Sequence, residues 1–215
     1  MFAEIFTVDA VSAYIAIGIV AGFLAGLLGV GGGSVLVPAL VWAFELAVLP
    51  EQWVFRLALG TSMATILFTS VSSVRSHHLH GAVRWDVVRL ITPGILAGTF
   101  GATFIAARVD TVPLAIFFAA FMAYVSVQML LNIKPKPARE LPGAVGMTAA
   151  GLGIGGISAL VAIGGGSLSV PFMTWCNVKM QNAIGTSAAI GLPLAIAGTV
   201  GYLVNGWGAP GTPPL

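Results

Sequence analysis

Runs of about twenty apolar residues follow one another along almost the whole chain, and they constrain the fold more than any other feature. A helix of that length is needed to cross about 30 Å of hydrocarbon. Only 7% of the 215 residues are charged, against about 25% in a soluble domain, so a water-facing surface could not be covered. The short alternating segments of a membrane β-barrel do not occur. The sequence therefore predicts an all-α polytopic protein, multi-pass in the cell inner (plasma) membrane.

The apolar runs predict eight helical spans, of which the second and the seventh are short. They cover residues 11–29, 34–49, 54–74, 87–107, 111–131, 143–163, 166–177 and 182–204. Alternating Lys and Pro in residues 132–142 indicate a linker. The predicted organisation is thus a first transmembrane repeat (1–131), a cytoplasmic linker (132–142) and a second transmembrane repeat (143–215).

Two motifs occur once in each half and in the same order. A Gly-Gly-Gly-Ser sequence followed by Val-Pro recurs 133 residues later (164 − 31), and an Ala-x-Gly-Thr-Ser sequence recurs 125 residues later (185 − 60). Duplicated halves with interrupted spans at matching positions are the sequence signature of a transporter site. The candidate substrate-binding residues are Gly31, Gly32, Gly33, Ser34, Pro38, Gly60, Thr61, Ser62, Gly164, Gly165, Gly166, Ser167, Pro171, Gly185, Thr186 and Ser187.

The triple glycine points to an anion cradle. Irregular backbone survives in a membrane only where it lines a cavity or is buried in protein. A break followed by a new helix exposes that helix's first N–H groups and the positive end of its dipole, and glycine lets an anion approach closely. The alternative is helix packing, which small-residue pairs such as Gly22/Gly26, Gly94/Gly98 and Gly151/Gly155 are expected to serve. The Gly-Thr-Ser hydroxyls, predicted at helix starts, could complete the site or bond back to their own helices.

The basic residues predict the orientation of the two halves. Seven of the nine Lys and Arg residues lie in or beside three loops, 75–86, 132–142 and 177–181, which the predicted spans place on one side. By the positive-inside rule that side is cytoplasmic. The first half then has five spans, so the second half enters from the opposite side and the repeats are inverted.

The second repeat is expected to be incomplete. Counterparts of spans 87–107 and 111–131 would end near residue 256 (131 + 125). Without them, the helix that carries Gly185 is expected to leave open a face that its twin buries, unless a longer chain or another chain supplies the cover.

The paired motifs resemble those of the sulfite exporter TauE/SafE family of permeases, and the resemblance covers nearly the whole chain. It implies a secondary transporter of a small, sulfur-containing or organic anion, driven by an ion gradient. Alternating access around opposed helix N-termini is the expected mechanism. A passive anion channel and a non-transporting membrane accessory subunit remain the alternatives.

Other signals favour neither an enzyme nor a cofactor. Gly151–Gly156 matches a dinucleotide fingerprint but lies in an apolar helix and follows no strand. His77, His78 and His80 fit a solvated loop better than a metal site, and the net charge of +2 is too small to suggest nucleic acid. The expected partners are the small anion, the lipid bilayer and a coupling ion. A proton is the candidate ion, with Glu45 the one acidic residue inside the spans, and a homo-oligomer is also considered.

Overall fold

The structure is a computed structural model that describes residues 12, 15–23, 33–46, 50–131 and 138–207. Within these ranges all regular structure is helical. Residues 15–23 form a helix, and seven further helices follow. They are α3 (Gly33–Leu46), α4 (Glu51–Leu79), α5 (Trp85–Arg108), α6 (Thr111–Leu130), α7 (Ala144–Val161), α8 (Gly166–Trp175) and α9 (Met180–Gly206).

The helices confirm the predicted all-α membrane architecture. Five of them, α4, α5, α6, α7 and α9, are long and apolar enough to cross a membrane. The two segments predicted to be short are short: α3 has 14 residues and α8 has 10. At 1.5 Å per residue they reach about 21 Å and 15 Å, less than the roughly 30 Å of hydrocarbon. Neither short helix can cross a membrane by itself, so the prediction that both segments are spans is wrong. The count of five spans in the first half, from which the inverted orientation was argued, is therefore not supported by these helices.

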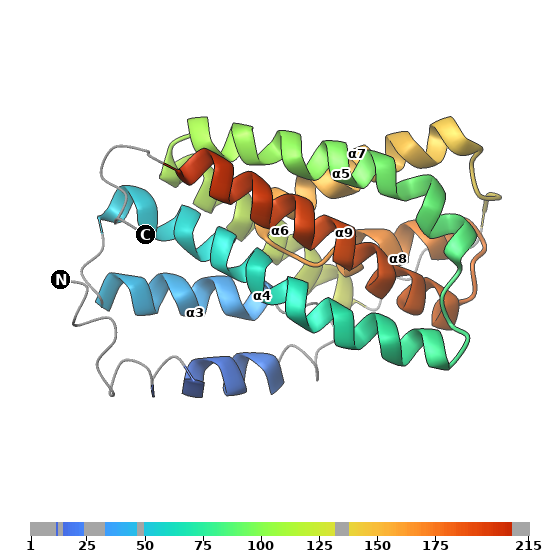
Figure 1. Cartoon of the computed structure of the whole chain (residues 1–215), viewed down its shortest axis with the longest axis horizontal. Coiled ribbons are helices and arrows are strands. Elements are labelled where there is room, and N and C mark those ends of the chain that lie inside the picture. Colours follow the sequence, from blue (N-terminus) through green and yellow to red (C-terminus); the bar gives the residue numbers. More distant parts are fainter. Residues whose placement is uncertain (1–11, 13–14, 24–32, 47–49, 132–137, 208–215) are drawn as a thin grey trace.

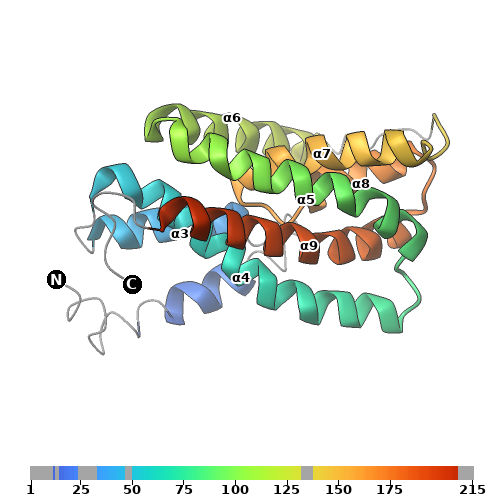
Figure 2. The ribbon, with the colours of Figure 1, turned by 45° about the horizontal axis from the view of Figure 1, so that its top comes forward.

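The two short helices occupy opposite halves of the bundle (Figure 1). Each begins near the middle; α3 runs toward one end and leads into α4, whereas α8 runs toward the other end and leads into α9 (Figures 1 and 2). The long helices α4 and α9 pack against each other between them. That the two repeats are inverted copies stays a prediction.

The tightest helix pair is α5 with α7, and glycines make it possible. A methyl group on Gly94 or Gly98 of α5 would overlap backbone atoms of α7. Gly151 and Gly155 of α7 meet α5 in the same way. The packing role predicted for these two pairs is confirmed. For Gly22, no atom of the described residues lies within 4 Å of the position its Cβ would take, and its predicted partner Gly26 lies outside the described residues.

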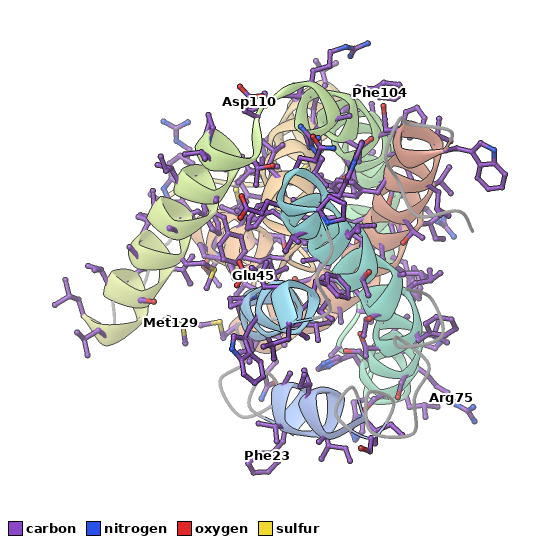
Figure 3. All side chains as sticks on the ribbon, turned by 90° about the vertical axis from the view of Figure 1, so that its left-hand side faces the viewer. Phe23, Glu45, Arg75, Phe104, Asp110 and Met129 are labelled. Atoms are coloured by element: carbon purple, nitrogen blue, oxygen red, sulfur yellow. The ribbon has the colours of Figure 1, made fainter. Side chains whose placement is uncertain are left out.

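Helix α5 also packs along α9, in the other half of the chain. Of the two helices that carry the Gly-Thr-Ser motifs, α4 and not α9 has the open face. Thr186 of α9 is fully buried, whereas the corresponding Thr61 of α4 is exposed. The prediction that the helix of Gly185 would be the uncovered one is wrong, because a first-half helix covers it. Helix α6 lies to one side of the bundle, as seen along the bundle axis (Figure 3).

Candidate functional site

The second Gly-Gly-Gly-Ser motif forms a sharp break between α7 and α8. Helix α7 ends at Val161, and Ala162 then adopts the left-handed conformation with φ 47°. Gly165 is also left-handed, with φ 79°, which a glycine adopts without strain. The Gly165 carbonyl accepts the N–H groups of Leu168 (3.2 Å) and Ser169 (2.8 Å), and so starts α8. The chain thus reverses inside the bundle and begins a new helix there.

The first break lies directly against the second. Gly33, the first residue of α3, faces the carbonyl group of Ala162 so closely that a Cβ would overlap its oxygen. Ser62 of α4, which is fully buried, donates a hydrogen bond to the same carbonyl oxygen at 3.3 Å. Gly31 and Gly32 lie outside the described residues. The described part of the first motif and the second motif are therefore brought together at the centre of the bundle.

A pair of buried hydroxyl groups lies beside the first turn of α8. The Ser187 oxygen of α9 is 2.8 Å from that of Ser169, and the Ser169 oxygen is 2.8 Å from the Gly165 carbonyl oxygen. A Cβ on Gly166 would lie 3.6 Å from the Ser187 oxygen. Sequence reasoning missed Ser169. The signal was the extra serine in Gly-Ser-Leu-Ser-Val-Pro, where the first half reads Gly-Ser-Val-Leu-Val-Pro.

The three residues of each Gly-Thr-Ser motif do not face the same site. They lie inside α4 and α9, so the prediction that they are helix starts is wrong; both helices begin earlier, in the polar segments at Glu51 and Met180. Successive residues of a helix point about 100° apart, so three in a row cannot face one site. Only the serine of each motif, Ser62 and Ser187, faces a break.

The other residues of these motifs serve helix and loop packing. The Thr186 hydroxyl accepts a hydrogen bond from the backbone N–H of Arg84 at 3.0 Å, and Gly185 lies against Ala82. Both contacts fix the segment between α4 and α5 onto α9. On α4, Gly60 faces Tyr202: a Cβ added to Gly60 would lie 3.6 Å from the Cγ atom of that ring. Thr61 is exposed.

The remaining predicted site residues differ in how deeply they are buried around the two breaks. Ser34 is buried near the start of α3, and Ser167 is half-buried near the start of α8. The carbonyl oxygen of Gly164 faces α9, where a Cβ added to Gly191 would lie 3.1 Å from that oxygen. Pro38 is exposed and Pro171 is half-buried, each in the second turn of its short helix. The prolines are therefore peripheral to the contact between the breaks.

The described arginines and lysine lie near helix ends and away from the breaks. Arg56, the nearest in sequence to a Gly-Thr-Ser motif, donates to the carbonyl oxygens of Ala106 (3.2 Å) and Val109 (2.7 Å) at the end of α5. Glu45 is exposed in the last turn of α3 (Figure 3). No group of three or more His, Cys, Asp or Glu among the described residues could hold a metal ion. Among the described residues, the backbone N–H groups at the helix starts are therefore the source of positive potential at the breaks.

The described parts of the three loops predicted to share one side, residues 75–86, 138–142 and 177–181, lie together at one end of the bundle (Figure 1). The Asn182 side chain donates to the Ala82 carbonyl at 3.2 Å, which joins the start of α9 to the loop between α4 and α5. The backbone N–H groups of Ala138 and Arg139 donate to the carbonyl of Trp175, at the end of α8. The Arg139 guanidinium also lies over the Trp175 ring, 4.8 Å from its centre.

Comparison with known proteins agrees with this architecture. The profile of the family described as sulfite exporter TauE/SafE matches residues 14–213. A Haemophilus influenzae protein named probable membrane transporter protein is 39% identical over 199 residues, which cover 90% of this chain and 74% of that protein. A Bacillus subtilis protein named probable membrane transporter protein YunE is 26% identical over 213 residues, 89% of this chain and 78% of its own length. No solved structure gives a significant match.

Proposed function

Because the chain belongs to the sulfite exporter TauE/SafE family, we propose that this multi-pass membrane protein is a secondary transporter of a small oxyanion, sulfur-containing or organic. The anion binds where the two glycine breaks meet, and access to it alternates between the two sides of the membrane. A proton gradient is the proposed driving force.

The observation that carries the proposal is the contact between the breaks. Gly33 at the start of α3 lies against the carbonyl of Ala162, the residue that caps the C-terminus of α7, and α8 begins four residues later (166 − 162). Each N-terminus carries about half a positive charge. The N-termini of α3 and α8 offer roughly one unit of positive charge, which about half a negative charge at the C-terminus of α7 offsets in part. No buried lysine or arginine among the described residues is needed for this, and the desolvation of such a residue in a membrane is costly.

Fixed backbone dipoles also suit turnover. A fully buried arginine would hold an anion through charge-assisted bonds that must break again on release. Backbone N–H groups and serine hydroxyls give a weaker and preorganised site. Conformational change then needs only a shift of two short helices relative to α4 and α9.

The direct test is uptake into proteoliposomes that contain the purified protein. Sulfite, thiosulfate, sulfoacetate and small carboxylates are offered with and without an imposed pH gradient, and protein-free liposomes are the blank. We expect saturable uptake of at least one of these anions that increases with the gradient. Saturable flux that does not depend on any imposed ion gradient would favour the passive channel. A folded protein that neither binds nor moves any of these anions would refute the proposal.

Two variants locate the site. Ser34→Ala is expected to weaken binding by about 1 kcal/mol, the scale of one lost cap or hydrogen bond. Gly165→Val is expected to abolish it, since valine is strained at φ 79° and blocks approach to the backbone. Ser70→Ala is the matched control, because the buried Ser70 hydroxyl donates to Leu67 within its own helix at 3.0 Å. Unchanged binding in folded Gly165→Val would assign the glycines to packing.

A further inference from the structure

Two pairs of arginines on α4 and α5 are spaced by the thickness of a membrane. Arg56 and Arg75 of α4 are 19 residues apart (75 − 56), and so are Arg89 and Arg108 of α5 (108 − 89). At 1.5 Å per residue each pair spans about 29 Å, close to the roughly 30 Å of hydrocarbon. The two helices run in opposite directions, so Arg75 and Arg89 both lie toward the end of the bundle with the three loops (Figure 1). Each helix therefore places one arginine at each surface of the membrane.

The arginines at the end away from the loops are bonded to the protein. The Arg56 guanidinium donates to the carbonyl oxygens of Ala106 (3.2 Å) and Val109 (2.7 Å). The Arg108 guanidinium donates to the Phe104 carbonyl oxygen at 3.5 Å and lies 6.0 Å from the centre of the Phe104 ring. Both of these charges have protein partners.

The arginines at the loop end have no such partners. Arg75 and Arg89 are exposed, and neither forms a hydrogen bond or an ion pair with another described residue. The neighbouring carboxylate of Asp86 is occupied, because both of its oxygens accept hydrogen bonds from Arg84. The Arg75 side chain points away from the bundle (Figure 3). Two positive charges at this surface of the membrane therefore lack a counter-charge from the described residues.

A tryptophan and a histidine lie between these two arginines. Trp85 begins α5, one turn before Arg89, and is 41% exposed. Its indole N–H donates to Nδ1 of His78, which lies one turn after Arg75 on α4, at 3.2 Å. Because Nδ1 accepts this bond, the neutral histidine ring carries its hydrogen on Nε2 and can donate it to another group. We call these four residues, Arg75, His78, Trp85 and Arg89, the loop-end patch.

The exposed face of α5 continues from the patch as an apolar surface. Leu96 and Phe100 are exposed, and at 100° per residue they lie within about 20° of Arg89 around the helix axis. Gly98, which meets α7, lies about 180° away on the opposite face. Arg89 therefore faces away from the neighbouring helix, with an apolar strip leading from it toward the middle of the membrane.

We propose that the loop-end patch binds the headgroup phosphate of anionic phospholipids. A guanidinium pairs with phosphate through two parallel hydrogen bonds, and tryptophan is enriched at the level of the headgroups. A free oxyanion could meet the same charges, but only a lipid also has acyl chains to cover the apolar strip beyond Arg89. Lipid binding at this patch does not depend on the proposed transport function.

Titration of the purified protein in detergent tests the proposal, with no transport substrate present. Phosphatidylglycerol should raise Tm, and phosphatidylcholine, whose headgroup has no net charge, should raise it less. In the double variant Arg75→Gln/Arg89→Gln, the phosphatidylglycerol concentration for the half-maximal effect should rise about 25-fold, or about fivefold for each arginine. The effect on the parent should also weaken between 0.1 M and 1 M salt, because the Debye length falls from about 10 Å to about 3 Å.

The matched control is Arg108→Gln, which removes an exposed charge from the other end of the helix that carries Arg89. It should shift the half-maximal concentration by less than about twofold, against about fivefold for Arg89→Gln. Equal responses to the two lipids, a parent midpoint in the double variant, or equal shifts in Arg89→Gln and Arg108→Gln would overturn the proposal. Stabilisation by inorganic phosphate as strong as that by phosphatidylglycerol would also overturn it, since the patch would then take free anions rather than lipid.

Discussion

Replacing Gly33 with alanine probes the contact on which the site depends. The new methyl group would overlap the carbonyl oxygen of Ala162 and lie 2.7 Å from its carbon and 3.2 Å from the Ser62 oxygen. The obstacle is backbone, because Ala162 is held in the left-handed conformation by its N–H bond to the Ser158 carbonyl. No flexible side chain can move aside to make room.

The expected cost follows from three effects. Overpacking a close contact costs about 1–3 kcal/mol. Displacing the Ala162 carbonyl also loses the Ser62 hydrogen bond, which contributes about 0.5–1.5 kcal/mol. The higher helix propensity of alanine returns at most about 1 kcal/mol, and less at the first residue of a helix. The net expectation is a destabilisation of about 2–3 kcal/mol.

Thermal unfolding of the purified protein in detergent measures this cost. A loss of about 2–3 kcal/mol corresponds to a fall in Tm of about 5–10 °C for a chain of this size. The matched control is Gly153→Ala in α7, where nothing lies within 4 Å of the new methyl group. It should unfold at or slightly above the parent temperature. If Gly33→Ala melts within about 1 °C of Gly153→Ala, the two breaks do not meet as described.

Three further predictions follow from other contacts. Thr186→Val leaves the partly buried N–H of Arg84 without its acceptor and should destabilise the protein by about 1–3 kcal/mol. Thr61→Val on the exposed face should change stability by less than about 0.5 kcal/mol, and equal effects of the two variants would refute this. Single cysteines at Ser76 or Ala138 in a Cys176→Ala background should be shielded from an impermeant thiol reagent in intact cells, and labelling of both would reverse the orientation. Burial raises the pKa of the Cys176 thiol, with Arg139 opposing in part, so less thiolate is present at pH 7.5 and alkylation should be slower before unfolding than after; equal rates would contradict it.

Hydropathy was enough to predict the helices from α3 to α9, whereas the predicted span 11–29 lies partly outside the described residues. Lipid leaves an apolar chain few ways to satisfy its backbone other than a helix, so the length of an apolar run sets the length of a span. The segments predicted to be short, 34–49 and 166–177, form the short helices α3 and α8, because glycines interrupt their apolar runs. Glycine pairs four residues apart in α5 and α7 identified the closest helix contact.

Side-chain direction was the part that the repeated motifs could not supply. Gly60, Thr61 and Ser62 are consecutive, yet one faces Tyr202, one is exposed and one reaches Ala162. Which of the three faces the centre depends on how the helix is rotated about its axis. That rotation is set by the neighbours packed around it, and a motif holds no information on those neighbours. Ser169 was missed because it belongs to one half only, and the repeat drew attention to shared residues.

The packing of α5 explains why equal motif residues have unequal surroundings. This first-half helix covers α7 and α9 of the second half rather than α4, which follows the first motif. Thr186 is therefore buried against the start of α5, and its twin Thr61 is open to the surroundings. Equivalence between the halves holds only where both motifs face the centre, at Ser62 and Ser187. Even there the partners differ, since Ser62 bonds to a carbonyl of the opposite half and Ser187 to a hydroxyl of its own. A repeat in sequence thus predicts which segments approach the site, and the helices packed around each segment decide which of its residues face it.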